Sequence, residues 1–138
     1  EKEIIFNVSG VPANQNVQLV IDYQLMGEDN QVLYQGTQQI NFTPMPLEFA
    51  LSQNYPNPFN PVTHIKYDLP EKSDVVLLIY DIMGREVATL INQQQEPGYR
   101  SVMWDGLNRS GQKVSAGMYF YTIQAGKFRQ TKKMILLK

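Results

Sequence analysis

The chain has 138 residues, of which 43% are hydrophobic and 18% charged, enough for one ordinary domain or two small ones with a real core. It has no cysteine, which excludes disulfides, thiolate metal sites and thiol nucleophiles. No apolar run approaches membrane-spanning length, so the sequence predicts no transmembrane segment. The first residue is Glu1 and no leader pattern follows it, so we interpret the chain as an excised fragment or a processed product.

The formal net charge of −1 hides an asymmetry along the chain. Residues 1–105 carry 13 acidic and five basic side chains, a net charge of −8, whereas residues 106–138 carry seven basic and no acidic ones. A basic tail of this kind can steer a domain toward an anionic partner. The alternative is that its lysines protect the edge of a sheet and pair with acidic strands.

The first 45 residues have a period of two in hydrophobicity, which predicts strands. One strand is expected around Ile4, Phe6 and Val8, a long one over 17–25, and two short ones over 32–34 and 38–42, with a turn at 27–30. Such a β-meander is too small to bury a core alone. We therefore place a domain boundary at 43–46 and interpret residues 1–45 as the C-terminal part of an upstream domain or linker.

Residues 51–61 are rich in proline and asparagine, which suits neither a helix nor a central strand. We expect a stiff, extended strap anchored by Tyr55 and Phe59, with asparagines bonded to nearby backbone. The strap is predicted to lie across a sheet edge or between the meander and the following domain. A proline-rich recognition ligand is the alternative. The asparagines in question are Asn54, Asn57 and Asn60.

Short strands separated by turn signals continue to the end of the chain. They are expected over 64–69, 74–80, 85–91, 102–104, 118–125 and 128–137, with the strand over 74–80 covered on both faces. The segment 85–91 also suits one helical turn, but we predict a strand paired with 75–80 through a turn at 81–84. Altogether the sequence predicts an all-β fold: an Ig-like antiparallel β-sandwich over 46–138, preceded by the meander.

Candidate catalytic and metal groups are weak. His64 lies on the polar face of its strand without partners for a triad or a zinc site. Asp105, Asn108 and Ser110 have the oxygen spacing of a calcium loop, but no bidentate acid follows them, and an Asx-turn loop is favoured. We therefore predict no enzymatic activity, no metal and no cofactor.

Tyrosines offer a different hypothesis. Tyr99, Tyr119 and Tyr121 would stack on a sugar if they faced solvent, yet tyrosines also serve as ordinary strand residues. A cell-surface carbohydrate-binding or adhesive module is therefore the alternative to the function considered next.

Four motifs occur in order: Leu51-Ser-Gln-Asn-Tyr-Pro-Asn-Pro-Phe-Asn-Pro61, Ile79-Tyr-Asp-Ile-Met-Gly-Arg-Glu-Val87, Gly117-Met-Tyr-Phe-Tyr-Thr-Ile-Gln-Ala-Gly126 and the terminal Lys133-Met-Ile-Leu-Leu-Lys138. Together they resemble the type A C-terminal sorting domain of the type IX secretion system (Por secretion system) of Bacteroidetes and related phyla. The resemblance covers roughly residues 47–138. The segment 104–121 also resembles the Ig-like domain of flagellar hook-capping proteins.

The resemblance implies a non-catalytic secretion signal. Such a domain directs an upstream cargo from the periplasm across the outer membrane to the exterior or the cell surface, followed by cleavage or surface attachment. The implied partners are the translocon, shuttle and sortase-like proteins, with no nucleic acid. The motif residues carried over as recognition candidates are Asn54, Pro56, Asn57, Pro58, Phe59, Gly84, Arg85, Gly117, Tyr119, Gly126, Lys132, Lys133 and Lys138.

The final strand is where we expect the address to be read. Alternation predicts that Arg129, Thr131 and Lys133 are exposed while Phe128, Met134 and Leu136 face the core. An acidic receptor would gain encounter rate from the basic tail, and an unpaired final strand would accept a receptor strand. Deletion of residues 133–138 is expected to abolish export while only partly destabilising the sandwich, and charge reversal at Lys132 and Lys133 to weaken export alone.

Overall fold

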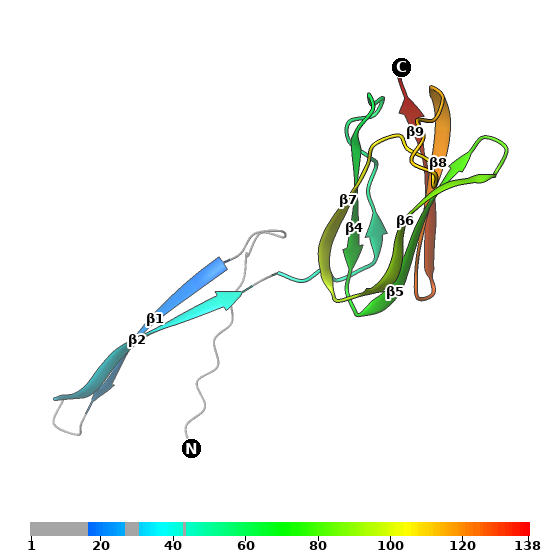
Figure 1. Cartoon of the computed structure of the whole chain (residues 1–138). Helices are drawn as coiled ribbons and strands as arrows, with labels where there is room; N and C mark the ends of the chain where they lie inside the picture. Colours follow the sequence, from blue (N-terminus) through cyan, green and yellow to red (C-terminus); the bar gives the residue numbers. More distant parts are fainter. Residues whose placement is uncertain (1–16, 27–30, 43) are drawn as a thin grey trace. The chain divides into compact units, whose positions relative to one another are not determined.

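The computed structural model describes residues 17–26, 31–42 and 44–138 (Figure 1). These residues form nine β-strands, and within those ranges there is no helix. No described segment is therefore a helix of the length and apolarity needed to cross a membrane. The chain divides into two compact units, Glu1–Pro44 and Met45–Lys138, which we call unit 1 and unit 2. The all-β class predicted from the period of two is confirmed.

Unit 1 contains an antiparallel hairpin of β1 (Val17–Met26) and β2 (Val32–Phe42). The prediction of two short strands over 32–34 and 38–42 is wrong, because β2 runs continuously through Gly36. Tyr23 lies opposite this glycine, and its hydroxyl would be 2.5 Å from an added Cβ, so the tyrosine side chain covers the glycine and fills the missing side-chain space. The strand expected around Ile4, Phe6 and Val8, and the turn at 27–30, lie outside the described residues.

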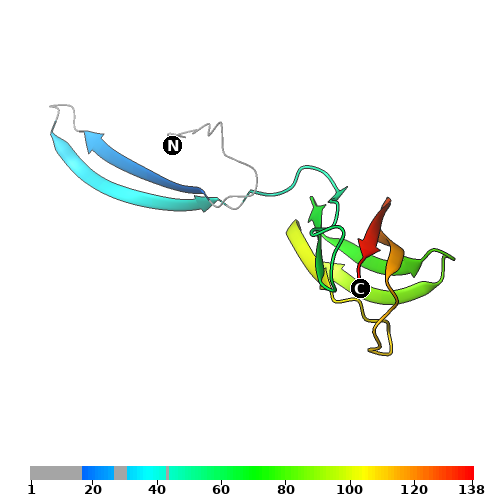
Figure 2. The ribbon, with the colours of Figure 1, turned by 90° about the horizontal axis from the view of Figure 1, so that it is seen from above.

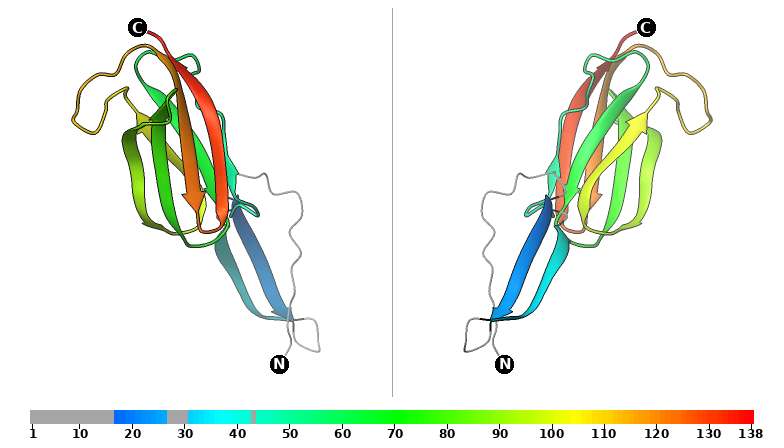
Figure 3. Two further views of the ribbon diagram at one scale, coloured as in Figure 1. Left: turned by 90° about the vertical axis from the view of Figure 1, so that its right-hand side faces the viewer. Right: turned by 90° about the vertical axis from the view of Figure 1, so that its left-hand side faces the viewer.

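Unit 2 is a sandwich of two antiparallel sheets (Figures 1 and 2). The three-stranded sheet has the order β3-β4-β7, formed by Ala50–Leu51, Thr63–Leu69 and Gly98–Trp104. The four-stranded sheet has the order β6-β5-β8-β9, formed by Glu86–Gln95, Ser73–Asp81, Gly117–Ala125 and Phe128–Leu136. Figure 3 shows the two layers of unit 2 from its sides. The predicted Ig-like sandwich is confirmed.

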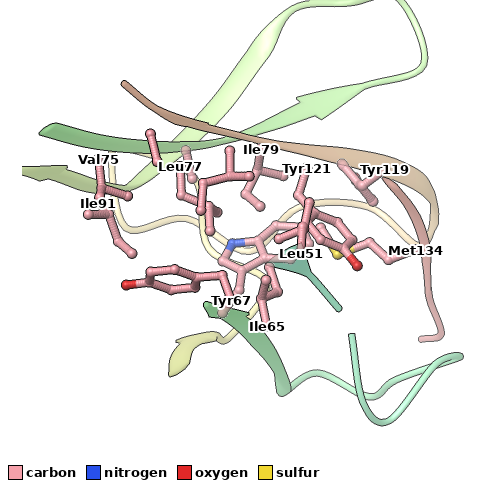
Figure 4. Close-up of a cluster of buried hydrophobic side chains, with 14 of the residues drawn as sticks. Leu51, Ile65, Tyr67, Val75, Leu77, Ile79, Ile91, Tyr119, Tyr121 and Met134 are labelled. Carbon is pink, nitrogen blue, oxygen red and sulfur yellow. The ribbon is translucent and has the colours of Figure 1, made fainter. Parts of the chain in front are cut away.

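The core lies between these sheets, where alternate side chains of both inner faces meet (Figure 4). Trp104 on β7 is the largest fully buried side chain, and its ring centroid lies 5.6 Å from that of Phe59 and 5.3 Å from that of Tyr119. Its indole nitrogen Nε1 donates to the carbonyl oxygen of Leu107 at 2.9 Å. The other buried apolar residues come from six strands: Leu51, Ile65, Tyr67, Leu69, Val75, Leu77, Ile79, Ala88, Ile91, Tyr121, Ile123, Ala125, Met134 and Leu136.

The strand β5 is covered fully on one face only. Its inward residues Val75, Leu77 and Ile79 are completely buried, but the outward Val76 and Leu78 are half-buried. The prediction of a strand covered on both faces is therefore half right. Side chains of the flanking strands of the same sheet give the outward residues partial shielding.

The ambiguous segment 85–91 is a strand, as predicted, and pairs with β5. The apolar residues of β6 are irregularly spaced because its pairing with β5 shifts register twice. The shifts lie between Leu77 and Leu78 and between Ile79 and Tyr80 of β5. At the first shift Leu90 is an extra residue in β6, and it lets Ala88 and Ile91, three positions apart, both face the core. A bulged strand therefore imitates the apolar spacing of a helical turn.

Candidate functional site

The strap over residues 51–61 runs across one open side of the sandwich and touches both sheets. Tyr55 forms an antiparallel bridge with His64 of β4, and Phe59 forms a parallel bridge with Leu136 of β9. The predicted position across a sheet edge is thereby confirmed. The strap is not uniformly extended, since it bends at 56–58 and 60–61. Pro56 and Pro58 are exposed, and each is preceded by a cis peptide bond.

Asn54 fixes the strap to the core. It is only 2% exposed, and its amide nitrogen Nδ2 donates to Thr63 Oγ1 at 2.9 Å and to the carbonyl oxygen of Pro56 at 3.1 Å. Its backbone N–H donates to the Tyr121 hydroxyl at 2.9 Å, and that hydroxyl donates to the carbonyl oxygen of Ser52 at 2.8 Å. Asn54 is therefore a buried structural residue, out of reach of a receptor in this conformation.

The Tyr121 hydroxyl gives the strap an alkaline pH dependence. Burial raises the pKa of Tyr121 to about 12, against the hydrogen bond from Asn54, which lowers it. Above about pH 10 the unfolded chain releases this proton while the folded chain keeps it. The retained proton of Tyr121 therefore contributes on the order of 1–2 kcal/mol to the free energy of unfolding. This stabilisation is complete below about pH 10 and is lost as the pH rises toward 12.

We expect Tyr121→Phe to lose stability less steeply than the wild type between pH 9.5 and 11.5. Urea unfolding at closely spaced pH values measures both slopes. Tyr67 and Tyr119, whose pKa values burial also raises, remain in the variant and keep part of the slope. Identical slopes in the two proteins would show that Tyr121 does not retain its proton in the folded state.

The strap also covers the free edge of β9. The N–H of Phe59 donates to the carbonyl oxygen of Ile135 at 3.0 Å, and the N–H of Leu137 donates to the carbonyl oxygen of Phe59 at 2.8 Å. The N–H of Ile135 also bonds the strap and donates to Asn57 Oδ1 at 3.0 Å. The expectation that the final strand offers unpaired backbone to a receptor strand is therefore wrong over residues 135–137, because the strap occupies these groups.

The same covering continues on both sides of this stretch. Gln53 Nε2 donates to the carbonyl oxygen of Lys133 at 2.8 Å, and Asn60 Nδ2 donates to the carbonyl oxygen of Lys138 at 3.2 Å. All three asparagines bond backbone, but only Asn54 bonds backbone close to it in sequence, the carbonyl oxygen of Pro56. The partners of Asn57 and Asn60 lie 78 residues away in sequence, and nothing in the local pattern of the strap identifies them.

The turn between β5 and β6 is organised by Asp81. Its carboxylate accepts hydrogen bonds from the N–H groups of Met83 and Arg85 and from Arg85 Nε, at 2.9, 3.0 and 2.7 Å. Gly84 closes the turn with a φ of 76° and donates its N–H to the carbonyl oxygen of Asp81. Partial burial would raise the pKa of Asp81, but the hydrogen bonds from Arg85 and Met83 and the Arg85 charge hold it below its usual value.

Gly117, Tyr119 and Gly126 build β8 and its hairpin. Tyr119 is buried edge-on against Trp104, and its hydroxyl donates to the carbonyl oxygen of Ser115 at 2.6 Å. Gly126 has a φ of 56° and forms the two-residue turn to β9 with Lys127, as predicted. Gly117, at the start of β8, also has a positive φ. These motif residues support the fold.

The basic tail divides between the two faces of β9. Lys133 and the terminal Lys138 are exposed, whereas Lys132 is half-buried on the opposite face, across from Tyr121. The predicted alternation is confirmed, with Arg129, Thr131 and Lys133 exposed and Met134 and Leu136 buried. Phe128 is half-buried and stacks on Phe49 with a centroid distance of 5.5 Å.

Most of the candidate residues meet at one end of the sandwich. Asp81 lies opposite Tyr119, and Gly117 lies opposite Leu136, so the β5–β6 turn, the start of β8 and the end of β9 share this end (Figure 1). Phe59 is bridged to Leu136 and belongs to the same group. We call it the C-terminal end of unit 2. Gly126 lies at the opposite end of the same strands.

The catalytic and metal candidates are not assembled into a site. His64 is exposed, and the described residues include no cluster of three histidine, cysteine, aspartate or glutamate side chains that would hold a metal. Asn108 Oδ1 accepts the N–H groups of Ser110 and Gln112 at 2.9 Å each, and Asp105 Oδ1 accepts that of Leu107 at 3.3 Å. The loop is thus the Asx-turn loop that the sequence favours, and its oxygens are engaged with backbone.

The tyrosines suspected of sugar stacking are mostly internal. Tyr121 and Tyr119 are buried, and only Tyr99 of that set is exposed. The most exposed aromatic of unit 2 is Tyr55, beside a hollow of about 480 Å³. The other lining residues of this hollow are Gln53, His64, Lys66 and Ser101.

Ile82 and Met83 were not singled out from the sequence. They stand at the tip of the β5–β6 turn and are 71% and 74% exposed. The turn signal at Gly84 indicates that Ile82 and Met83 lie in a turn, but the sequence does not tell whether apolar turn residues fold inward or project.

Fold and motif positions together define unit 2 as an Ig-like β-sandwich with a strap over its last strand. Residues 60–127 match the family model of the FlgD Ig-like domain. One region of dimeric latent PorU from Porphyromonas gingivalis is similar in fold, with a TM-score of 0.52 at 18% identity over 88% of this chain. PorZ of the same species, an essential surface component of its type IX secretion system, matches 65% of the chain with a TM-score of 0.44 at 20% identity.

The chain spans 12% of PorU and 11% of PorZ, so these matches concern one region of much larger proteins. No curated protein has significant sequence similarity to the chain. The family model and the PorU match therefore bear on the fold of this chain.

Proposed function

We propose that unit 2 is a type A C-terminal sorting domain: a non-catalytic signal that directs a cargo across the outer membrane through the type IX translocon. The observation that carries the proposal is the order of the four motifs and their meeting at one end of one Ig-like domain. The strap, the β5–β6 turn and the end of β9 contain three of them, and the fourth begins at this end with Gly117 and runs along β8. In this proposal unit 1 belongs to the cargo or its linker.

The motif residues suit a signal that is read in the folded state. Asn54, Phe59 and Tyr119 are buried and hold the strap and core, so the motif preserves the shape of the domain. Arg85, Lys133 and Lys138 are exposed and available to partners. The proposed partners are the translocon, shuttle and sortase-like proteins, with cleavage or surface attachment of the cargo after export.

The direct test is an export assay. The 138-residue chain is fused behind an inert periplasmic reporter in a host with an active type IX system, and the reporter is measured in the medium, on the surface and in the periplasm. Export that requires both the fused chain and the translocon supports the proposal. Reporter that remains in the periplasm would refute it.

Charge reversal at Lys133 is expected to lower export several-fold with a change in stability below about 0.5 kcal/mol, because an exposed charge contributes little to folding. Lys66→Glu is the matched control, since Lys66 is an exposed strand lysine on the other sheet. Export assays and thermal unfolding of both variants measure the two effects. Normal export of Lys133→Glu would leave the basic tail as edge protection only.

Deletion of residues 133–138 is not a clean test of recognition. It removes the buried Met134 and Leu136 and all the backbone groups of β9 that Phe59 pairs with. Loss of two buried apolar side chains costs about 4–10 kcal/mol, which is comparable to the stability of a whole domain. The structure thus revises the expectation of partial destabilisation, and we expect the deleted chain to unfold.

The carbohydrate-binding alternative is favoured by one observation, the exposed Tyr55 beside the hollow that contains His64 and Lys66. An aromatic face next to hydrogen-bonding groups is suited to a sugar ring. Retention of the purified chain on insoluble polysaccharide, lost in Tyr55→Ala, would support this alternative. Unretained wild-type chain would remove it.

A further inference from the structure

The β5–β6 turn carries the most exposed pair of adjacent large apolar side chains in the described part of unit 2. Ile82 and Met83, which we call the apolar tip, are 71% and 74% exposed. Figures 1 and 2 show the hairpin projecting beyond the neighbouring strands of the same sheet. Isolated apolar side chains are common on protein surfaces, but two adjacent ones on a projecting turn are typical of a contact with another molecule.

The turn that carries the tip is rigid. The Asp81 carboxylate accepts three hydrogen bonds from Met83 and Arg85, and backbone bonds between Asp81 and Arg85 and between Gly84 and Asp81 close the loop. Polar groups of Asp81, Met83, Gly84 and Arg85 are thus bonded within the turn, while the side chains of Ile82 and Met83 are exposed. A preorganised apolar knob loses little conformational entropy when it binds.

Two further exposed apolar residues lie on the same sheet at this end of unit 2. Met118 lies directly opposite Ile135, in the register position next to the pair of Asp81 and Tyr119, and both are exposed. The C-terminal end of unit 2 thus carries exposed apolar side chains besides the tip. Methionine and arginine are among the residues enriched at protein interfaces.

Two ion pairs next to the tip expose their arginines more than their carboxylates. Arg85 pairs with Asp81, and Arg109 pairs with Glu86, around a hollow of about 440 Å³. The arginine side chains are 74% and 60% exposed, whereas their carboxylate partners are 18% and 28% exposed. The two guanidinium groups therefore present positive charge to solvent, although each pair is neutral, and an acidic rim is the complementary surface.

We propose that the apolar tip inserts into an apolar recess with an acidic rim on a protein of the secretion apparatus, with Arg85 and Arg109 facing that rim. The inference rests on the proposed secretion function and locates its contact surface. It moves the main contact from the last strand, whose edge the strap occupies, to the β5–β6 turn. The partner is a folded protein and not a lipid surface, because a short apolar knob beside paired charges fits a shaped recess better than a planar membrane.

The test is export of the full chain fused to the inert reporter, in three forms. The double variant Ile82→Ser, Met83→Ser should reduce the exported fraction at least tenfold and accumulate in the periplasm, whereas wild type is exported. Leu47→Ser is the matched control, because Leu47 is a 94% exposed apolar residue of the same unit, and its export should stay within twofold of wild type. Thermal unfolding should be unchanged in both, since the substituted side chains are exposed.

The possible results separate the two proposals. Export of wild type and of the tip variant alike overturns the role of the tip and leaves the secretion function standing. Absence of wild-type export overturns the secretion function and the tip contact with it. Binding of the purified chain to vesicles of phosphatidylglycerol and phosphatidylethanolamine that is lost in the tip variant would assign the tip to a lipid surface and overturn the protein recess.

Discussion

Trp104→Ala is expected to lower the free energy of unfolding of unit 2 by about 3–5 kcal/mol, a large part of the stability of a domain of this size. The side chain is 2% exposed and lies between the strap and β8, with Phe59 on one side and Tyr119 on the other. Alanine leaves a cavity where these aromatic rings meet. It also removes the donor that bonds the carbonyl oxygen of Leu107.

Urea unfolding followed by circular dichroism measures this loss, since the variant has no tryptophan to report by fluorescence. Met103→Ala is the matched control, because Met103 is the preceding residue on β7 and its side chain is exposed. We expect the control to stay within about 0.5 kcal/mol of wild type. A loss below about 1 kcal/mol in Trp104→Ala would mean that the core closes over the missing ring.

The strands of unit 2 could be predicted because their hydrophobic period is local. In β4 the residues Ile65, Tyr67 and Leu69 alternate with polar ones, and all three are buried. The hydrophobic period did not predict the structure correctly at individual irregular residues of a strand. The bulge in β6 produced an apparent helical spacing. In β2, where two short strands were predicted, one strand runs through Gly36 with Tyr23 folded over it.

The sequence does not show which face of β8 is turned toward the core. The hypothesis of a sugar-binding surface of tyrosines depended on this. Tyr119, Tyr121 and Ile123 alternate with Met118 and Phe120, so both faces contain large apolar side chains. Only the tertiary structure places the tyrosines inside, where Tyr121 bonds to the strap and Tyr119 packs on Trp104. Their exposure as a sugar-binding surface was therefore an open hypothesis, and their burial is a result of packing between distant segments.

The strap illustrates the same distinction. A position across a sheet edge was one of two that the sequence offered, but the target was not predicted, because the contact between Asn57 and Ile135 joins residues 78 positions apart. Local chemistry indicates that an asparagine will bond backbone and does not say which backbone. The expectation that the final strand offers unpaired backbone to a receptor strand was wrong for this reason.

Phe59→Ala is expected to detach the strap from β9. Phe59 is 1% exposed and packs on Trp104, so the substitution should cost about 3–5 kcal/mol of unfolding free energy. The backbone of residue 59 keeps its hydrogen-bonding groups, but the side chain that holds it against the core is gone. The amides of Ile135 and Leu137, which bond the strap, should then exchange with solvent faster than amides of β8.

Hydrogen exchange of individual amides distinguishes local opening from global unfolding. Tyr55→Ala is the matched control, since Tyr55 belongs to the same strap but its side chain is 80% exposed, and its stability should change by less than about 0.5 kcal/mol. Uniform acceleration of all amides in Phe59→Ala would mean that the strap and sandwich unfold together. Selective acceleration at Ile135 and Leu137 would instead show that the edge of β9 is closed only by the anchored strap, because these amides donate to Asn57 and Phe59.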